Sequence, residues 1–272
     1  MKKFNANKEI KLSKFLKECY GAELPYSTYQ KLLRNKDIKV NGKRVNSDLL
    51  LKVDDIVEVY YDGAKKPLTV LFEDENVFAL DKPSGITSED LEVLVKNTYK
   101  SAKLCHRLDR NTSGILLFSL NDDAEIELLK AFKDRTISKY YLAEVYGKLN
   151  ADFGRLEDYL VKDENLSEVK VYDKKVDGSV KIITEYKVLE KTDDTTLVEV
   201  NLITGKTHQI RAHFAFYGNF IIGDGKYGDN LINRAKGAKY QRLTAYKVIF
   251  NFDGGKLSYL NNKELKLSRK PW

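Results

Sequence analysis

Short strand-like hydrophobic runs dominate the sequence from residue 68 onward and restrict the folds that it can adopt. They are rich in β-branched and aromatic residues, as in VKIITEYKVLE (180–190), TLVEVNLI (196–203) and YKVIFNF (246–252). Helical patterns separate some of these runs, at residues 88–99, 122–132 and 207–217. Strands interspersed with a few helices predict an α+β fold, with a mixed or antiparallel sheet flanked by helices.

The first 62 residues have a different pattern. Helical spacing of apolar residues predicts one helix over 11–20 and a second from Ser27 to Asn35. The dipeptide Asn41-Gly42 then predicts a β-hairpin, and the alternation in 56–61 predicts a closing strand. These features predict a small α/β domain over 1–62, a linker over 63–67 and a larger domain over 68–272.

The positive charge is concentrated at the N-terminal end. Residues 1–52 contain 13 Lys or Arg and five Asp or Glu, a net charge of +8, whereas the remaining residues sum to −1. Such asymmetry indicates a polyanion-binding domain joined to a nearly neutral one. The charge alone supports equally a lysine-rich surface that only contacts solvent.

Several classes of protein do not fit this sequence. The chain is 42% hydrophobic and 32% charged, has no run of about 18 apolar residues, and its N-terminus lacks the apolar stretch of a secretory signal. A cytoplasmic protein without a membrane partner is expected.

The two cysteines and three histidines do not have the spacing of a disulfide framework or a metal site. No glycine-rich nucleotide-binding motif is present, so neither a metal nor a cofactor is expected.

The segment HRLDRNTSGILLF (106–118) contains the strongest candidate for chemistry. Asp109 lies between Arg107 and Arg110, and nearby guanidinium groups favour the ionised carboxylate. A positioned carboxylate can act as a nucleophile toward an electrophilic carbon. On chemistry alone, a carboxylate that caps a turn and pairs with its neighbours is the slightly better interpretation.

The same segment resembles the signature of the RluA family of pseudouridine synthases. Further stretches resemble that family's motifs in the same order, over about residues 68–252. They are LDKPSGI (80–86), SKYYLAEVYG (138–147), LITGKTHQIRAHFAFYGNFIIGDGKYG (202–228) and QRLTAYKVIF (241–250). The resemblance implies an isomerase that detaches uracil from its ribose, turns it, and rejoins it through C5. This reaction needs no cofactor, and the second domain is its expected catalytic domain.

The resemblance also implies the roles of individual residues. Asp109 matches the family's nucleophile, Tyr141 the tyrosine that stacks on the base, and Arg211 the arginine that pairs with the carboxylate. Arg107 matches the side chain that enters the RNA helix where the uridine leaves it. Flipping of the uridine out of the helix is required because its reacting atoms are inaccessible inside a stacked duplex.

The expected partner is RNA, bound by both domains of a monomer. In the catalytic domain, Arg110, Lys206 and His208 are the further candidate RNA contacts, and Lys206 stands where the family more often has arginine. The first domain resembles the alpha-L RNA-binding module. That resemblance implies RNA contacts by Lys31, Arg34, Lys36, Lys39, Lys43 and Arg44. Family members with this module imply large-subunit ribosomal RNA as substrate, and transfer RNA stays open.

Two other functions are alternatives to a pseudouridine synthase. A non-catalytic RNA-binding or ribosome-assembly factor would have no physical need for Asp109, Tyr141 and Arg211 together. A glycosidase would need a second carboxylate as its acid partner, and these motifs contain none. Formation of pseudouridine in RNA treated with the pure protein would exclude both.

Overall fold

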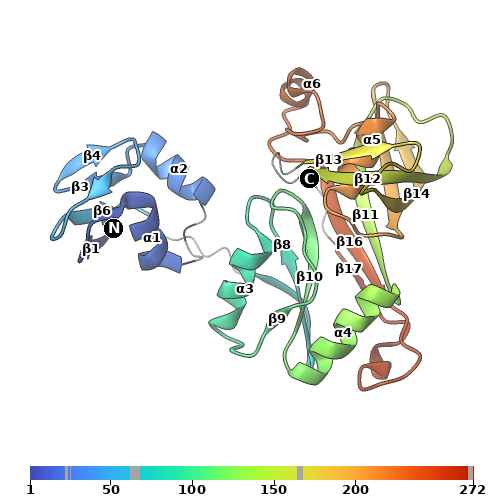
Figure 1. The fold of residues 1–272 in the computed structure, drawn as a ribbon, viewed down its shortest axis with the longest axis horizontal. Coiled ribbons are helices and arrows are strands. Elements are labelled where there is room, and N and C mark those ends of the chain that lie inside the picture. The colour runs from blue at the N-terminus through green and yellow to red at the C-terminus, as the bar shows by residue number, and fades with distance from the viewer. Residues whose placement is uncertain (22–23, 25, 62–67, 164–167, 269–271) are drawn as a thin grey trace. The chain divides into compact units, whose positions relative to one another are not determined.

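The chain folds into two compact units (Figure 1). The computed structural model describes all residues except 22–23, 25, 62–67, 164–167 and 269–271. The first unit contains residues 1–68 and 89–100, and the second contains residues 69–88 and 101–272. The predicted linker, 63–67, lies outside the described residues, so the predicted domain boundary stays a prediction.

The first unit is built on a four-stranded antiparallel sheet with two helices. Its order is β1 (Lys2–Asn5), β6 (Ile56–Val59), β3 (Ile38–Val40) and β4 (Lys43–Val45). A second, two-stranded pair joins β2 (Ile10–Lys11) to β5 (Leu50–Leu51). Helices α1 (Leu12–Tyr20) and α2 (Tyr26–Arg34) share one hydrophobic core with the sheet, which includes Leu16, Leu33, Ile38 and Val57.

Two local interactions explain why this unit folds as it does. The β3–β4 turn places Asn41 and Gly42 at φ values of 50° and 78°, the left-handed conformation that an Asn-Gly hairpin provides. Helix α1 begins after Lys11, whose side chain makes no cap. Asp48 takes that part, since its carboxylate accepts hydrogen bonds from Ser13 N at 2.9 Å and Ser13 Oγ at 2.8 Å.

The second unit is organised around an 11-stranded mixed sheet. Nine strands follow one another in the order β13-β12-β14-β15-β11-β16-β10-β8-β7, while β9 pairs with β10 and β17 with β16. All neighbours are antiparallel except β10 and β16. The bounds are β7 Thr69–Glu73, β8 Val77–Lys82, β9 Lys103–Leu104, β10 Ser113–Ser119, β11 Ile137–Tyr146, β12 Phe153–Asp163, β13 Glu168–Tyr172, β14 Val180–Lys191, β15 Thr195–Leu202, β16 Leu243–Phe250 and β17 Glu264–Lys266. The predicted α+β class is confirmed.

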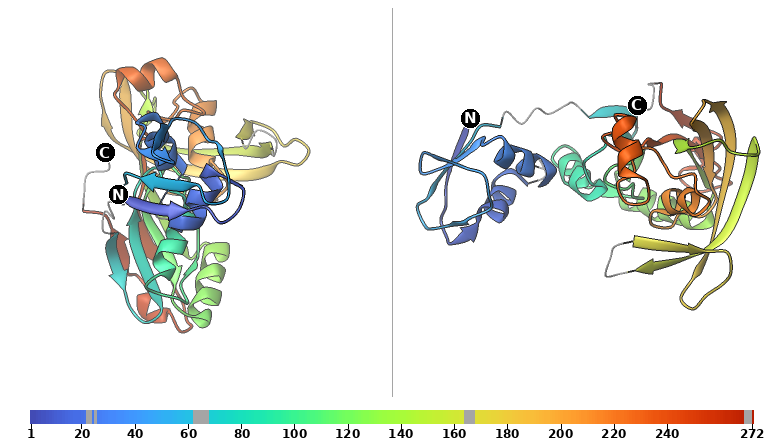
Figure 2. Two further views of the ribbon diagram at one scale, coloured as in Figure 1. Left: turned by 90° about the vertical axis from the view of Figure 1, so that its left-hand side faces the viewer. Right: turned by 90° about the horizontal axis from the view of Figure 1, so that it is seen from above.

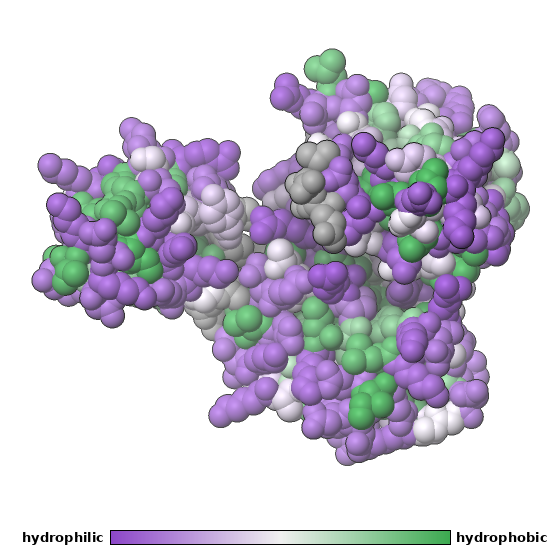
Figure 3. Space-filling view, in the orientation of Figure 1, coloured by the Kyte–Doolittle hydropathy of each residue, from purple (hydrophilic) through white to green (hydrophobic). Residues whose placement is uncertain are grey.

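Helices flank this sheet, and the β12–β13 hairpin extends from its end (Figure 2). The described helices of the second unit are α4 (Asp122–Asp134), α5 (Gln209–Phe216), α6 (Asn230–Ala235) and a single 3-10 turn (Ser258–Leu260). Helix α3 (Ser88–Lys96) belongs to the first unit from Glu89 onward. None of the described helices is long and apolar enough to cross a membrane. On the face drawn in Figure 3, hydrophilic residues predominate and hydrophobic ones are scattered.

Strand β10 is buried along its whole length and follows directly on the Asp109 segment. Its parallel pairing with β16 brings Gly114 against Ala245. Gly114 has φ 118°, and a Cβ atom there would lie 2.1 Å from the carbonyl oxygen of Ala245. Only glycine fits this position, so the glycine of the Asn-Thr-Ser-Gly motif fixes where β10 enters the sheet.

We therefore expect Gly114→Ala to destabilise the protein by roughly 3 kcal/mol or more, because backbone strain and a clash with the backbone of β16 add together. Gly178 is a matched control: its φ is 72°, but a Cβ atom there has nothing within 4 Å. Gly178→Ala should cost only about 1 kcal/mol. Denaturant unfolding of both variants measures the difference. Equal losses would show that close approach to Ala245 is not the constraint.

Candidate active site

Asp109 lies in the segment between β9 and β10, and a buried lysine holds that segment in place. Lys82, at the end of β8, is completely buried. Its ammonium donates hydrogen bonds to the carbonyl oxygens of Pro83 at 3.1 Å, Ile86 at 2.7 Å and Arg110 at 3.0 Å. Hydrogen bonds from a charged donor are stronger than neutral ones. The residue after Asp109 is thereby tied to the turn that follows β8.

Three further hydrogen bonds join the same turn to the Asp109 segment. Gly85 N donates to Arg110 O at 2.8 Å. The buried hydroxyl of Ser88 donates to Leu108 O and accepts from Leu108 N, both at 3.0 Å. The main chain on both sides of Asp109 is therefore fixed, and the Asp109 side chain is the part of this segment that projects into the site.

The carboxylate of Asp109 faces Arg211, a residue of α5 that is 7% exposed. Arg211 Nη1 donates to Asp109 Oδ2 at 2.8 Å. The Asp109 side chain is 26% exposed, which leaves part of the carboxylate accessible from solvent. One paired oxygen and partial solvent access suit a carboxylate that is held in place and can still reach a substrate.

A second carboxylate, Asp224, holds the other edge of the same guanidinium group. It accepts from Arg211 Nε at 2.6 Å and Nη2 at 2.9 Å, and it is completely buried. Backbone N–H groups of Lys226 and Tyr227 also donate to it, at 2.9 and 3.1 Å. Burial alone would raise the pKa of Asp224, but these hydrogen bonds and the charge of Arg211 outweigh it and lower the pKa.

The pKa of Arg211 responds in the opposite direction. Burial opposes its charge, but the hydrogen bonds and negative charges of Asp224 and Asp109 are stronger and raise the pKa. Arg211 is therefore a fixed cation between two carboxylates, and the bidentate pair with Asp224 sets the direction in which Nη1 points.

His208 also lies beside Asp109, with Nε2 3.9 Å from Oδ2, the oxygen that accepts from Arg211. Its φ of 54° is rare for a residue other than glycine. Nδ1 lies 2.9 Å from the hydroxyl of Tyr227, which accepts a hydrogen bond from Val169 N at 2.9 Å. Burial, with the charges of Arg211 and Lys226, lowers the pKa of His208 and favours the neutral ring.

Tyr141 projects from β11 on the face of the sheet that α5 covers. It pairs with Val200 of β15, which pairs with Tyr186 of β14, and Tyr186 lies 5.7 Å from the ring of Phe214 in α5. Burial, and then the charge of Asp109, raise the pKa of Tyr141. Tyr141 is therefore a neutral, buried aromatic whose hydroxyl keeps its proton in the electric field of Asp109.

A buried polar network anchors α5 to the sheet and so fixes Arg211. His213, with no exposed surface, lies 2.9 Å from Asp158 on β12 and 2.9 Å from Thr184 on β14. Gln209 donates to Thr184 Oγ1 at 3.0 Å and accepts from Lys206 N at 3.1 Å. His213 is a structural residue of this site, since its ring is sealed from solvent.

The structure brings together part of the predicted site. Asp109, Tyr141, Arg211 and His208 meet on one face of the second unit, while the side chains of Arg107, Arg110 and Lys206 are exposed. The residues of the first unit that are predicted to contact RNA are Lys31, Arg34, Lys36, Lys39, Lys43 and Arg44. All of them are exposed except Lys39, which is half-buried with its ammonium 5.0 Å from the centre of the Tyr60 ring. Their roles toward RNA stay predictions.

Sequence reasoning missed Asp224, Tyr227 and Lys82. Asp224 and Tyr227 both lie in the quoted motif 202–228, and the acid between Gly223 and Gly225 was a usable signal for a carboxylate held in a turn. Lys82 lies in the quoted segment 80–86, but nothing in its pattern indicates a buried ammonium. Among the described residues, no group of three or more His, Cys, Asp or Glu side chains is arranged to hold a metal ion.

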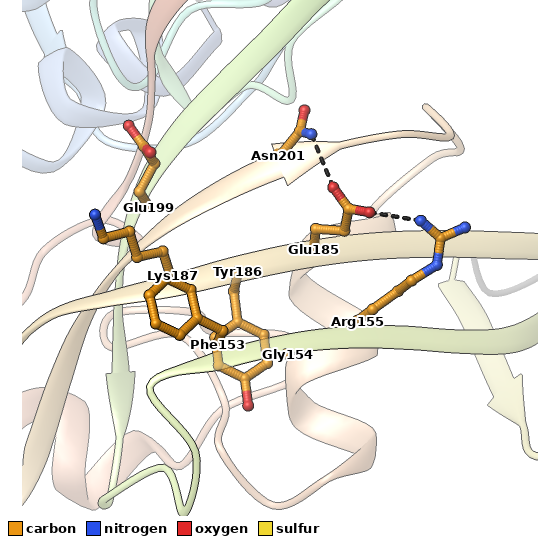
Figure 4. Close-up of a pocket in the computed structure, with 8 residues that line it drawn as sticks. All are labelled: Phe153, Gly154, Arg155, Glu185, Tyr186, Lys187, Glu199 and Asn201. Carbon is orange, nitrogen blue, oxygen red and sulfur yellow. Dashed lines mark hydrogen bonds and ion pairs between the residues drawn. The ribbon is translucent and has the colours of Figure 1, made fainter.

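A separate open pocket of about 460 Å³ lies on the opposite face of this sheet (Figure 4). The charged residues that line it alternate along their strands with residues that face α5, so they project from the other face. Several of them are paired with one another. Arg155 donates to Glu185 at 2.5 Å, and Asn201 donates to the same carboxylate at 3.0 Å. This pocket lacks Asp109, Arg211 and Tyr141, so the α5 face is the candidate active site.

A histidine next to the Asp109 segment predicts how stability depends on pH. His106 Nε2 accepts a hydrogen bond from Leu117 N at 3.1 Å, and its ring lies 4.7 Å from that of Phe132. Burial, and then the charge of Lys139, lower the pKa of His106 from 6.5 to about 3. Between these two pH values His106 binds a proton in the unfolded chain but not in the folded one. The free energy of unfolding therefore decreases as pH falls from 6.5 toward 3.

We expect His106→Gln, which keeps an acceptor for Leu117 N but cannot titrate, to lose less stability on acidification. Between pH 6.5 and 5 the difference from wild type should reach about 1.6 kcal/mol, because the slope approaches ~1.4 kcal/mol per pH unit only well below pH 6.5. Denaturant unfolding at a series of pH values measures it, and other titrating groups cancel in the comparison. Parallel curves for the two proteins would contradict a His106 ring that stays neutral in the folded protein.

Comparison with known proteins gives a consistent set of relatives. A family model described as RNA pseudouridylate synthase matches residues 76–216. An uncharacterized RNA pseudouridine synthase of Mycoplasma capricolum subsp. capricolum is 32% identical, over 97% of this chain and 96% of its own. The ribosomal large subunit pseudouridine synthase C of Vibrio cholerae is 32% identical over 76% of this chain and 73% of its own. The solved structure of human RNA Pseudouridylate Synthase Domain Containing 1 shares the fold, with a TM-score of 0.63 at 20% identity over 76% of this chain and 91% of that one.

Proposed function

Because the chain belongs to the family of RNA pseudouridylate synthases, we propose that Asp109 is the nucleophile of its isomerisation reaction. The observation that carries the proposal is the position of Asp109: its carboxylate is bonded to a buried arginine and is still 26% exposed. Asp224, the other carboxylate bonded to Arg211, does not meet the second condition because it is completely buried.

In the proposed reaction, the Asp109 carboxylate attacks the target uridine and leads to cleavage of the bond between uracil and ribose. Arg211 fixes the direction of the carboxylate, because its guanidinium is itself held by Asp224 at 2.6 and 2.9 Å. The detached uracil turns, and its C5 bonds to the ribose as the bond to Asp109 breaks. The proton on C5 is then released and N1 takes up a proton. No atom is gained or lost, and Arg211 stays a positioning residue throughout.

Tyr141 is proposed to stack on the uracil ring while the ring is detached. It lies on the same face as Asp109 and keeps its phenol proton, because burial and the negative charge of Asp109 both raise its pKa. A neutral aromatic can hold a planar base by stacking, and its hydroxyl can donate a hydrogen bond. Loss of this contact would free the base within the site.

The uridine is proposed to leave the RNA helix before it reaches Asp109, since its reacting atoms are inaccessible inside a duplex. Arg107, which is exposed two residues before Asp109, would fill the space that the uridine vacates. Arg110, Lys206 and His208 are proposed to contact the RNA around it. His208 would do so from beside the carboxylate, 3.9 Å from Asp109.

Large-subunit ribosomal RNA is the substrate that we propose. Support comes from relatives named ribosomal large subunit pseudouridine synthase C, which are 32% identical to this chain in Rickettsia felis and Vibrio cholerae. Transfer RNA is the alternative. Incubation of the protein with unmodified transcripts of each RNA, followed by mapping of pseudouridine, distinguishes the two.

We expect Asp109→Asn to fold and bind RNA as the wild type does but to form no pseudouridine, because an amide of nearly the same shape is not nucleophilic. Release of tritium from RNA labelled at C5 of uracil measures turnover. Exposed Asp123 on α4 offers a control carboxylate, and Asp123→Asn should keep full activity. Turnover close to wild type in Asp109→Asn would remove Asp109 as the nucleophile.

The first unit is proposed to bind RNA through the exposed basic residues of α2 and the β3–β4 hairpin. Residues 1–52 have a net charge of +8, while the rest of the chain is nearly neutral. Lys43 and Arg44 are exposed on β4, and Arg44 donates to Lys36 O at 2.5 Å, which fixes its guanidinium near the end of α2. Such a cluster suits contact with phosphates.

We expect the double substitution Lys43→Gln and Arg44→Gln to weaken RNA binding and make it less sensitive to salt. Each lost phosphate contact should lower the log–log salt slope by about 0.7 for single-stranded RNA, or about 1.4 for the pair. The matched control changes Lys14 and Lys17, two exposed lysines on α1, to glutamine. If both double variants shift the slope equally, general charge and not a defined surface binds the RNA.

A further inference from the structure

Lys139 is a partly buried cation that the proposed reaction does not use. It lies on β11 two residues before Tyr141, so both side chains project from the same face of the sheet. Its ammonium is 5.5 Å from the centre of the Phe132 ring on α4. Within the described part of the chain, no carboxylate lies within 4 Å of it, and no hydrogen bond from it is found.

A buried charge without an opposite charge is expensive for a folded protein. Burial lowers the pKa of Lys139, which shows that its surroundings oppose the charge. The cation–π contact with the Phe132 ring offsets only part of this cost. An apolar side chain of the same length would fill the space at lower cost. A lysine here therefore indicates that a negative group from outside the chain approaches it.

The position of Lys139 relative to the active site identifies where that group would lie. A Cβ atom at Gly205 would be 3.1 Å from Lys139 Nζ, so the ammonium lies directly against the backbone of this segment. Gly205 begins the four-residue run that ends at His208, whose ring is 3.9 Å from Asp109. Lys206, between them, is exposed and cationic. One short segment thus connects the unpaired ammonium to the proposed nucleophile.

We propose that Lys139, together with Lys206, binds one backbone phosphate of the substrate RNA next to the reacting nucleotide. The proposal rests on the proposed function, because it is the RNA strand that delivers a phosphate to this place. A phosphodiester supplies the single negative charge that the ammonium lacks. Lys139 would hold it as a point charge from the floor of the site, and Lys206 would reach it from the solvent side. The contact would set the position of the strand and so the position of the flipped uridine over Asp109.

The test compares Lys139→Met with Lys187→Met in the full-length protein. Lys187 is a matched control: it is also a strand lysine whose ammonium lies over a phenylalanine ring, 5.8 Å from that of Phe153. It is exposed and lies on the opposite face of the sheet, in the pocket of Figure 4. The probe is the ribosomal RNA fragment that the wild type modifies.

Lys139→Met should bind this RNA several-fold more weakly at low salt, with a salt slope lower by about 0.7. Its thermal stability should be equal to or higher than that of the wild type, and KM should rise more than kcat falls. Lys187→Met should leave binding, slope and turnover unchanged. A structural role for Lys139 would instead lower thermal stability and leave the slope intact, and that result would overturn the proposal.

A second arm neutralises the RNA instead of the protein. Methylphosphonate linkages, which remove one negative charge each, are placed singly on either side of the target uridine. One of them should weaken binding to the wild type and have no further effect on Lys139→Met. If every linkage affects both proteins equally, the phosphate contact is refuted. Wild-type pseudouridine formation is read in the same RNA, so failure of the proposed function is seen separately from failure at Lys139.

Discussion

The second unit depends on one buried cation, the guanidinium of Arg211, being shared between two carboxylates. Asp224 takes two of its donors and Asp109 takes a third. Removing a charge from water is costly, and the chain compensates with hydrogen bonds at every member of the cluster. Asp224 also accepts from two backbone N–H groups, and α5 is tied to the sheet through His213 and Gln209. The helix must lie where it does because Arg211 has to reach both acids at once.

The main chain around Asp109 is fixed by a different set of interactions. Lys82 and Ser88 hold the main chain before and after Asp109, and Gly114 sets the depth at which β10 enters the sheet. Hydrogen bonds to the main chain of Leu108 and Arg110, together with the pairing of the Asp109 carboxylate with Arg211, leave the carboxylate little freedom to move. Such fixed geometry lowers the reorganisation that a nucleophile needs at the moment of attack. In this way strands far apart in the sequence determine one oxygen position.

Much of this arrangement could be predicted from the sequence, and the remainder had physical reasons to stay hidden. Asp109, Tyr141 and Arg211 stand in contiguous motifs, so a resemblance identifies them without any distances. The pairing of Arg211 with Asp224 depends on the fold of residues 211–224, which no local pattern reveals. The strands β12 and β13 were missed because their outer faces alternate Lys, Arg and Glu with apolar residues, and α6 because six residues carry little helical signal. Hydrophobic patterning predicts elements that bury a face, and these elements bury little.

The charges of the site explain why the chain surrounds it with cations. Asp109 and Asp224 contribute two negative charges and Arg211 one positive charge, while burial keeps His208 and Tyr141 neutral. The cluster is therefore negative overall, yet the substrate of this enzyme family is a polyanion. An RNA strand can approach such a cluster only if other groups compensate its phosphates. Exposed Arg107, Arg110 and Lys206 could supply charge at the rim, and Lys139 could supply it inside. The excess of eight positive charges in residues 1–52 would act earlier, by raising the local concentration of RNA before any contact with the site. Attraction of RNA needs positive charge, whereas the proposed chemistry needs a carboxylate. This chain places most of its excess positive charge in residues 1–52 and its carboxylate cluster in the second unit.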